Sequence, residues 1–148
     1  MHRSIREQGG AYGGGATQDS NSAAFRFYSY RDPRLTETMA DFDASLEWLQ
    51  TTDHPWQAVE EAILGVIGSI DKPGSPAGEA KSTYQAELFG RTREKREQFR
   101  NRVLAVTAAD LKRVGALYLQ PEKASIAVVT HAGQKDLVEQ LGLAIRTC

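Results

Sequence analysis

The chain turns from helix to strand within Ile5-Arg6-Glu7-Gln8-Gly9-Gly10-Ala11-Tyr12-Gly13-Gly14-Gly15. Glycine accepts the left-handed backbone that closes a helix, so Gly9 and Gly10 predict a helix end followed by a reversal of the chain. Glycines also let a peptide backbone approach closely, while Arg6 can donate paired hydrogen bonds and Tyr12 can add one hydroxyl. The other interpretation is structural, with a helix cap, a strand tyrosine and a surface arginine.

A β-hairpin is expected directly after this turn. Residues 11–17 lead into a turn-forming cluster at 18–22, and residues 23–30 are rich in strand-forming side chains. Side chains alternate between the two faces of a strand. Phe25 and Phe27 should therefore share one face, and the other face should carry Arg26, Tyr28 and Tyr30.

Helical spacing of apolar residues follows the hairpin. Helices are expected from 36 to the break at His54-Pro55, then over 56–70, 77–89, 93–104, from the cap Thr107-Ala108-Ala109-Asp110 onward, and over 137–145. We expect the first two helices to lie on a sheet. A proline-rich loop is predicted at 71–76 and a buried strand at 124–130.

This order predicts an α+β fold with an antiparallel sheet packed against helices. Three strands cover little area, so we expect a missing N-terminal part to complete the sheet, and residues 1–148 to be a single truncated domain. Unpaired strand edges in such a piece would favour self-association.

Composition and charge argue against binding to nucleic acid and against a membrane span. The 148 residues are 41% apolar and carry a net charge of −1, which gives no overall field for nucleic acid. Residues 91–102 hold six basic and two acidic side chains, but on a helix this is typical of a solvated face. No apolar run is long enough to span a membrane. The single Cys148 is compatible with the cytoplasm or another reducing compartment.

Catalytic motifs are not found in the sequence. A zinc peptidase of the inverted type needs H-x-x-E-H, but His2, His54 and His131 are scattered. No serine lies in G-x-S-x-G, and no G-K-[ST] follows the glycine tract. We therefore expect no catalytic residue and no metal ligand in this chain.

Two motifs resemble a known family. The segment from Arg6 to Gly13 is similar to the substrate-binding segment in the last domain of insulinase/pitrilysin-type zinc metallopeptidases, above all the presequence protease branch. Ser29-Tyr30-Arg31-Asp32-Pro33 is similar to a later stretch in that branch. Glu60-Glu61-Ala62-Ile63 and Asp71-Lys72-Pro73 fall where the family has a helix and a proline-containing loop.

The resemblance implies both a fold and a role. In that family four homologous α/β domains form two halves that close around an unfolded peptide, with zinc in the first domain. This chain resembles the later part of the fourth, a metallopeptidase-repeat-like α/β sandwich. Arg6 and Tyr12 would then reach the bound peptide, and Gly9, Gly10 and Gly13 would shape their backbone. The zinc cofactor would belong to the parent enzyme.

Three hypotheses follow. The first is an inactive, substrate-binding C-terminal domain of a zinc metalloendopeptidase that degrades short unstructured peptides. The second is a stand-alone interaction domain that acts in trans with a separate zinc-bearing subunit. The third is a small domain that binds an anionic ligand at residues 9–15. In the first two the partners are a peptide and the zinc-bearing N-terminal half, with no nucleic acid and no membrane.

Overall fold

The computed structural model describes residues 3–19 and 22–146. It begins with one turn of π-helix, η1, and a two-stranded sheet, which six α-helices and two short 3₁₀ turns follow. Their bounds are η1 Arg3–Gln8, β1 Gly13–Asp19, β2 Ala24–Tyr30, α1 Thr36–Thr51, α2 Trp56–Ile70, α3 Pro76–Leu88, α4 Arg93–Leu104, α5 Ala108–Tyr118, η2 Pro121–Lys123, η3 Ala132–Gln134 and α6 Lys135–Gln140.

The hairpin forms as predicted. β1 and β2 pair antiparallel, from Gly13 opposite Tyr30 to Asp19 opposite Ala24. Phe27 stacks on Phe42 of α1 with ring centroids 5.1 Å apart, so the phenylalanine face of β2 packs against a helix. The face of Tyr28 and Tyr30 is exposed. The sheet is therefore covered on one side.

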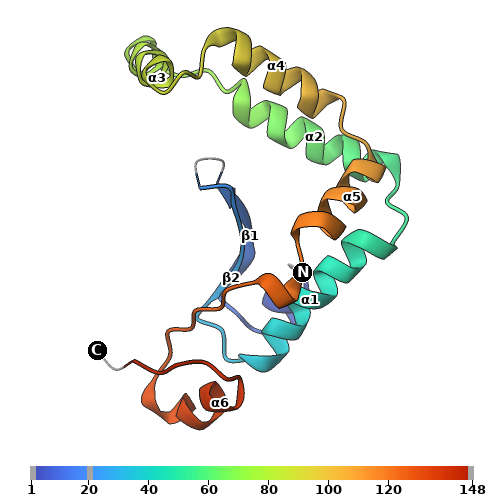
Figure 1. The fold of residues 1–148 in the computed structure, drawn as a ribbon, viewed down its shortest axis with the longest axis vertical. Helices are drawn as coiled ribbons and strands as arrows, with labels where there is room; N and C mark the ends of the chain where they lie inside the picture. The colour runs from blue at the N-terminus through green and yellow to red at the C-terminus, as the bar shows by residue number, and fades with distance from the viewer. Residues whose placement is uncertain (1–2, 20–21, 147–148) are drawn as a thin grey trace.

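The helices form a curved row with the hairpin on its inner side (Figure 1). α1 packs against α5, where Gly115 is buried because Leu49 and Gln50 approach it closely. α2 packs against α4 at one end of the row, and α6 lies at the other. The prediction that α2 lies on the sheet is wrong, since its apolar stripe contacts α4 instead.

Helix ends follow local chemistry. Ser75 and Thr92 accept hydrogen bonds from backbone amides at the starts of α3 and α4. At α5 the predicted capping box is confirmed, with Thr107 accepting from the amide of Asp110 and the carboxylate of Asp110 accepting from the amide of Thr107. These bonds satisfy amides that a helix leaves without partners.

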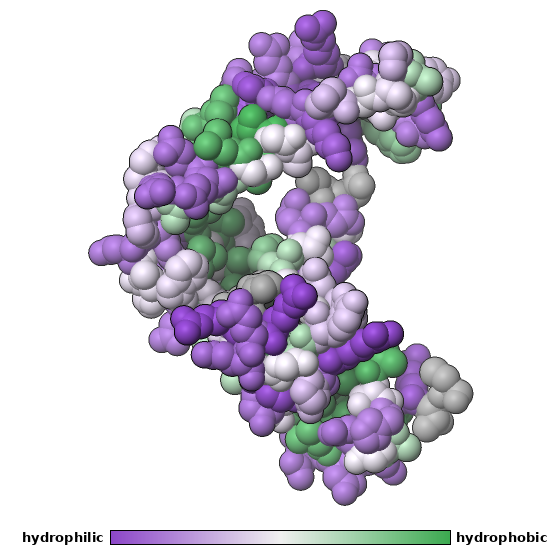
Figure 2. All heavy atoms as spheres, turned by 180° about the vertical axis from the view of Figure 1, so that it is seen from behind, coloured by the Kyte–Doolittle hydropathy of each residue, from purple (hydrophilic) through white to green (hydrophobic). Residues whose placement is uncertain are grey.

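Buried apolar side chains form small separate groups. One group lies where α2 meets α4 and the start of α5, and it joins Val59, Ile63 and Ile67 to Val103 and Leu111. Another holds Ile5 and Ala11 at the turn before the hairpin. The space-filling view shows apolar residues gathered in separate patches along this face of the arc (Figure 2).

Two predictions near the C-terminus are corrected. Residues 124–130 form no strand, and Ile126 and Val129 are exposed. A strand needs a neighbouring strand, and no partner lies beside this segment in the described part of the chain. The last helix spans Lys135–Gln140 and not 137–145, because Gly142 has a φ of +69° just past its end. The fold is nevertheless α+β, with an antiparallel sheet backed by helix.

Candidate functional site

The turn between η1 and β1 closes as its glycines predict. The amide of Gly10, whose φ is +79°, donates to the carbonyl of Arg6 over 3.2 Å. The amide of Ala11 donates to the carbonyl of Ile5 over the same distance of 3.2 Å. Because Ile5 and Ala11 are buried, their side chains fix the turn to the interior of the protein. The side chains that stand on it are therefore carried by a fixed backbone.

Arg6 and Tyr12 lie at the two ends of this turn. Both are exposed, Tyr12 to 61%. Within residues 3–19 and 22–146, neither the Arg6 guanidinium nor the Tyr12 hydroxyl has a hydrogen-bond or ion-pair partner. Donors that are exposed and without an internal partner are available to a ligand.

The ring of Tyr12 lies against the last residue of β2 and the residue that follows it. Its centroid lies 5.5 Å from that of Tyr30 and 5.3 Å from the guanidinium carbon of Arg31. The amide of Tyr12 donates to the carbonyl of Arg31 over 3.2 Å. Sequence reasoning missed Arg31 as a site residue. Strand alternation would place Arg31 on the face opposite Tyr30, and its φ of +48° just past the end of β2 departs from that alternation.

The glycine tract makes room for neighbouring side chains. A Cβ on Gly13 would overlap the ring of Tyr30, and one on Gly15 would lie 3.1 Å from the hydroxyl of Tyr28. On the opposite face a Cβ on Gly14 would lie 2.8 Å from Cγ2 of Ile5. Gly13–Gly15 are thus part of a paired strand that the tyrosines cover. This is not the curled loop of amides that cradles an anion.

Asp32 is the electrostatic centre next to this turn. Its carboxylate accepts from the hydroxyls of Ser29 over 2.6 Å and Thr38 over 2.7 Å, and from the amide of Arg34 over 3.0 Å. Burial raises its pKa, but these hydrogen bonds and the charge of Arg34 outweigh burial and lower the pKa of Asp32 below its ordinary value of 3.8. The carboxylate therefore ties the end of β2 to the start of α1.

This pKa shift predicts a pH dependence of stability. A carboxylate with a lowered folded-state pKa stabilises the fold above its unfolded pKa and loses that contribution as pH falls through the folded pKa. The unfolding temperature of Asp32→Asn should therefore be below that of wild type at pH 7, and the gap should close below about pH 4. Thermal unfolding monitored by circular dichroism checks this. Asp43→Asn, at an exposed position of α1, controls for the loss of one carboxylate; a gap that persists in acid would contradict the assignment.

The histidines have structural surroundings. Nε2 of His54 lies 2.8 Å from the carbonyl of Leu49, and its ring packs edge-on against Trp48. Nδ1 of His131 accepts from the amide of Gly133. His2 and Cys148 lie outside the described residues. In the part of the chain that the structure describes, no three His, Cys, Asp or Glu side chains are grouped to hold a metal ion. Among the same residues, none of the helices combines the length and the apolar character that a membrane span requires.

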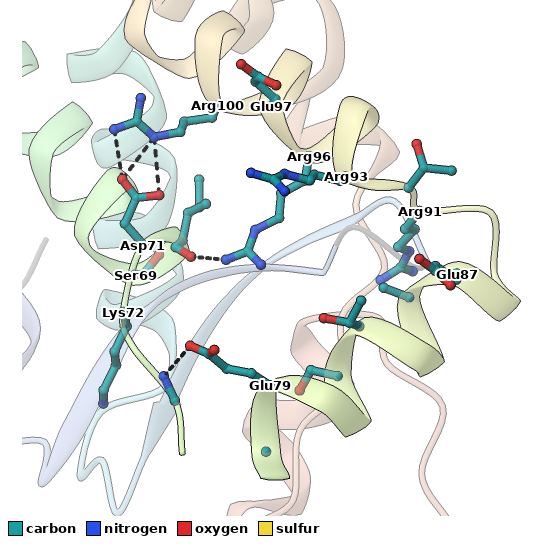
Figure 3. Close-up of a pocket in the computed structure, with 17 residues that line it drawn as sticks. Ser69, Asp71, Lys72, Glu79, Glu87, Arg91, Arg93, Arg96, Glu97 and Arg100 are labelled. Carbon is teal, nitrogen blue, oxygen red and sulfur yellow. Dashed lines mark hydrogen bonds and ion pairs between the residues drawn. The ribbon is translucent and has the colours of Figure 1, made fainter. Parts of the chain in front are cut away.

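A hollow of about 990 Å³ lies between α2, α3 and α4. Figure 3 shows Arg100 paired with Asp71, while Arg96 and Glu79 bond to the backbone at the two ends of the 70–74 segment. Arg100 is 2.8 Å from Asp71, which raises the pKa of Arg100 and lowers that of Asp71 through their hydrogen bond, and Arg96 donates to the carbonyl of Ile70. These contacts hold α4 to the end of α2. The prediction that 91–102 is only a solvated face therefore overlooked two arginines that bridge helices.

The sequence of this chain is similar to those of known proteins. A family described as "PreP C-terminal domain" matches residues 1–134. "Presequence protease, mitochondrial" of Yarrowia lipolytica is 39% identical over 130 residues, which are 87% of this chain and 13% of that protein. The proteins of that name from Danio rerio and Mus musculus are 39% and 35% identical over 119 residues, 80% of this chain and 11% of theirs. The chain thus spans about an eighth of the length of these relatives.

The relatives correct one expectation. A single cysteine suggested the cytoplasm or another reducing compartment, but the names of the relatives place those proteins in mitochondria. The expectation of a cytoplasmic protein is therefore wrong. One cysteine in 148 residues carries too little information to separate one compartment from another.

Proposed function

Because this chain belongs to the family of presequence protease C-terminal domains, we propose that it is the substrate-binding, non-catalytic domain of a zinc metalloendopeptidase that degrades short unstructured peptides. One observation carries the proposal. Arg6 and Tyr12, the two donors that the sequence singles out, are exposed, without an internal partner among the described residues, and held at the two ends of one closed turn.

The two side chains suit an extended peptide. Two N–H groups of the Arg6 guanidinium can donate to one peptide carbonyl oxygen, and the hydroxyl of Tyr12 can donate a third hydrogen bond. Donors held toward an oxygen that gains negative charge during peptide hydrolysis stabilise the transition state. Gly9, Gly10 and Gly13 contribute by shaping the backbone that carries them.

The proposal divides the chemistry between two parts. Zinc and the water that it activates belong to the N-terminal half of the peptidase, either in the same chain or as a separate subunit. This domain orients the peptide and holds its carbonyl oxygen. The proposed partners are thus the peptide and the zinc-bearing half, with no nucleic acid and no membrane; self-association of the isolated domain stays a prediction.

Exchanging domains between proteins tests this function. Residues 1–134 would replace the matching segment of the Yarrowia lipolytica presequence protease, and cleavage of a short fluorogenic peptide would be compared with that of the same protease lacking the segment. We expect the chimera to cleave the peptide and the truncated protein to be inactive. Adding the 148-residue chain in trans to the truncated protein asks whether a covalent link is needed.

Two results would contradict the proposal. The truncated protease could cleave the peptide as fast as the chimera, which would remove any role for this domain in the reaction. The 148-residue chain alone could cleave it with bound zinc, which would make the domain catalytic.

A further inference from the structure

Arg34 lies between η1 and α1, where it contacts the turn that carries Arg6 and Tyr12. Its Nη2 donates to the carbonyl of Ser4 and to Oδ2 of Asp41, both over 3.2 Å. Its Nε is 4.0 Å from Oδ1 of Asp32. The side chain is 26% exposed, so its charge lies partly within the fold and is balanced by two carboxylates.

The turn is built around this guanidinium. A Cβ on Gly9 would overlap Nη2 and Cζ of Arg34, so only glycine lets the guanidinium lie against the backbone there. Nε of Arg34 is buried and has no hydrogen-bond partner among the residues that the structure describes. Burying a donor without a hydrogen bond costs free energy. The hydrogen bonds that Nη2 makes to Ser4 and Asp41 offset this cost.

The segment that carries Arg34 also holds the other end of the turn. Arg31 accepts a hydrogen bond from the amide of Tyr12 and lies against its ring. Three residues later Arg34 reaches the carbonyl of Ser4 in η1, and Asp32 fixes the backbone between them. Residues 31–34 therefore contact both the helix of Arg6 and Tyr12, which directly precedes β1.

We infer that Arg34 is a positioning residue that sets the placement of Arg6 relative to Tyr12 for peptide binding. The inference rests on the proposed function of those two side chains. Arg34 acts through the turn, since its own guanidinium is committed to Ser4 and Asp41. Misplacing a reacting geometry by about 1 Å can cost about 100-fold in rate, so a small shift of the turn would be measurable.

The test uses the chimeric peptidase and a double-mutant cycle. Arg34→Met retains the apolar stem and removes the guanidinium. We expect kcat/KM to fall about 10- to 100-fold, mainly in kcat. If Arg34 acts through the donors, Arg34→Met should matter little once they are gone. In a variant that already carries Arg6→Ala and Tyr12→Phe, it should lower kcat/KM further by less than about threefold. Equal losses in both backgrounds would show a general structural role and overturn the inference.

Two further variants keep the test decisive. Arg100→Met removes an arginine with a similar ion pair between α2 and α4, and it should leave kcat/KM within about twofold of wild type, as expected for distant independent sites. Arg34→Lys keeps the charge near Asp41 but lacks the planar fork. Arg34→Lys therefore tests the inference even if Arg34→Met does not fold. We expect Arg34→Lys to fold with a lowered kcat, and a wild-type kcat would overturn the inference. Wild-type rates for Arg6→Ala and Tyr12→Phe would instead refute the proposed function.

Discussion

Replacing Arg6 by alanine in the chimeric peptidase is expected to lower kcat/KM for a short unstructured peptide by about 100-fold or more, the cost of one well-placed transition-state donor. Tyr12→Phe should lower it by a similar factor through the loss of one hydroxyl. The phenylalanine ring can keep the contacts with Tyr30 and Arg31, so the turn should stay in place. Steady-state kinetics with a fluorogenic peptide measures both effects.

The structure supplies a matched control for Arg6. Arg26 is also an exposed arginine, but it lies on β2 opposite Thr17, away from the turn. Arg26→Ala should leave kcat/KM within about twofold, as surface changes away from a site usually do. Zinc content should be equal in all three variants, because the proposal places the metal in the other half. Wild-type rates in both Arg6→Ala and Tyr12→Phe would contradict the proposed role of these residues in peptide binding.

Gly9→Ala should have the largest effect on stability. The new Cβ would lie 2.5 Å from the carbonyl oxygen of Ile5 and overlap the guanidinium of Arg34. Neither group can move freely, because Ile5 is fully buried and Arg34 is held by Ser4 and Asp41. Overpacking of this kind costs about 2 kcal/mol. We therefore expect the unfolding temperature to fall by about 4–8 °C.

Gly65 provides the comparison. It lies inside α2, where an added Cβ would meet no atom within 4 Å. Because alanine is a better helix former than glycine, Gly65→Ala should raise the unfolding temperature slightly. Thermal unfolding of the 148-residue chain and its two variants, at one protein concentration, gives all three values. A Gly9→Ala chain as stable as wild type would show that the turn has another conformation.

Local features of the fold could be predicted because their causes lie within a few residues. The bounds 93–104 of α4 and the cap of α5 follow from hydroxyl and carboxylate side chains beside free amides. The closing of η1 follows from the positive φ of Gly10. The hairpin follows from a turn cluster between two strand-forming runs.

Other features failed because their causes lie far apart along the chain. Residues 124–130 have the composition of a strand, but composition cannot supply a neighbouring strand. The apolar stripe of α2 suggested a sheet, yet the contacting surface comes from α4, beyond the whole of α3. Periodicity shows which face of a helix is buried and not what buries it.

The candidate site divides in the same way. Arg6, Tyr12 and the glycines between them could be nominated from the sequence because donor chemistry and glycine's backbone freedom are properties of single residues, and the family resemblance is what implied their role. Only the tertiary structure shows that Arg31 orients Tyr12 and that Arg34, thirty residues after Ser4, holds η1. The physical reason is that steric and hydrogen-bonding preferences act within a turn, while long-range contacts depend on which surfaces the folded chain brings together.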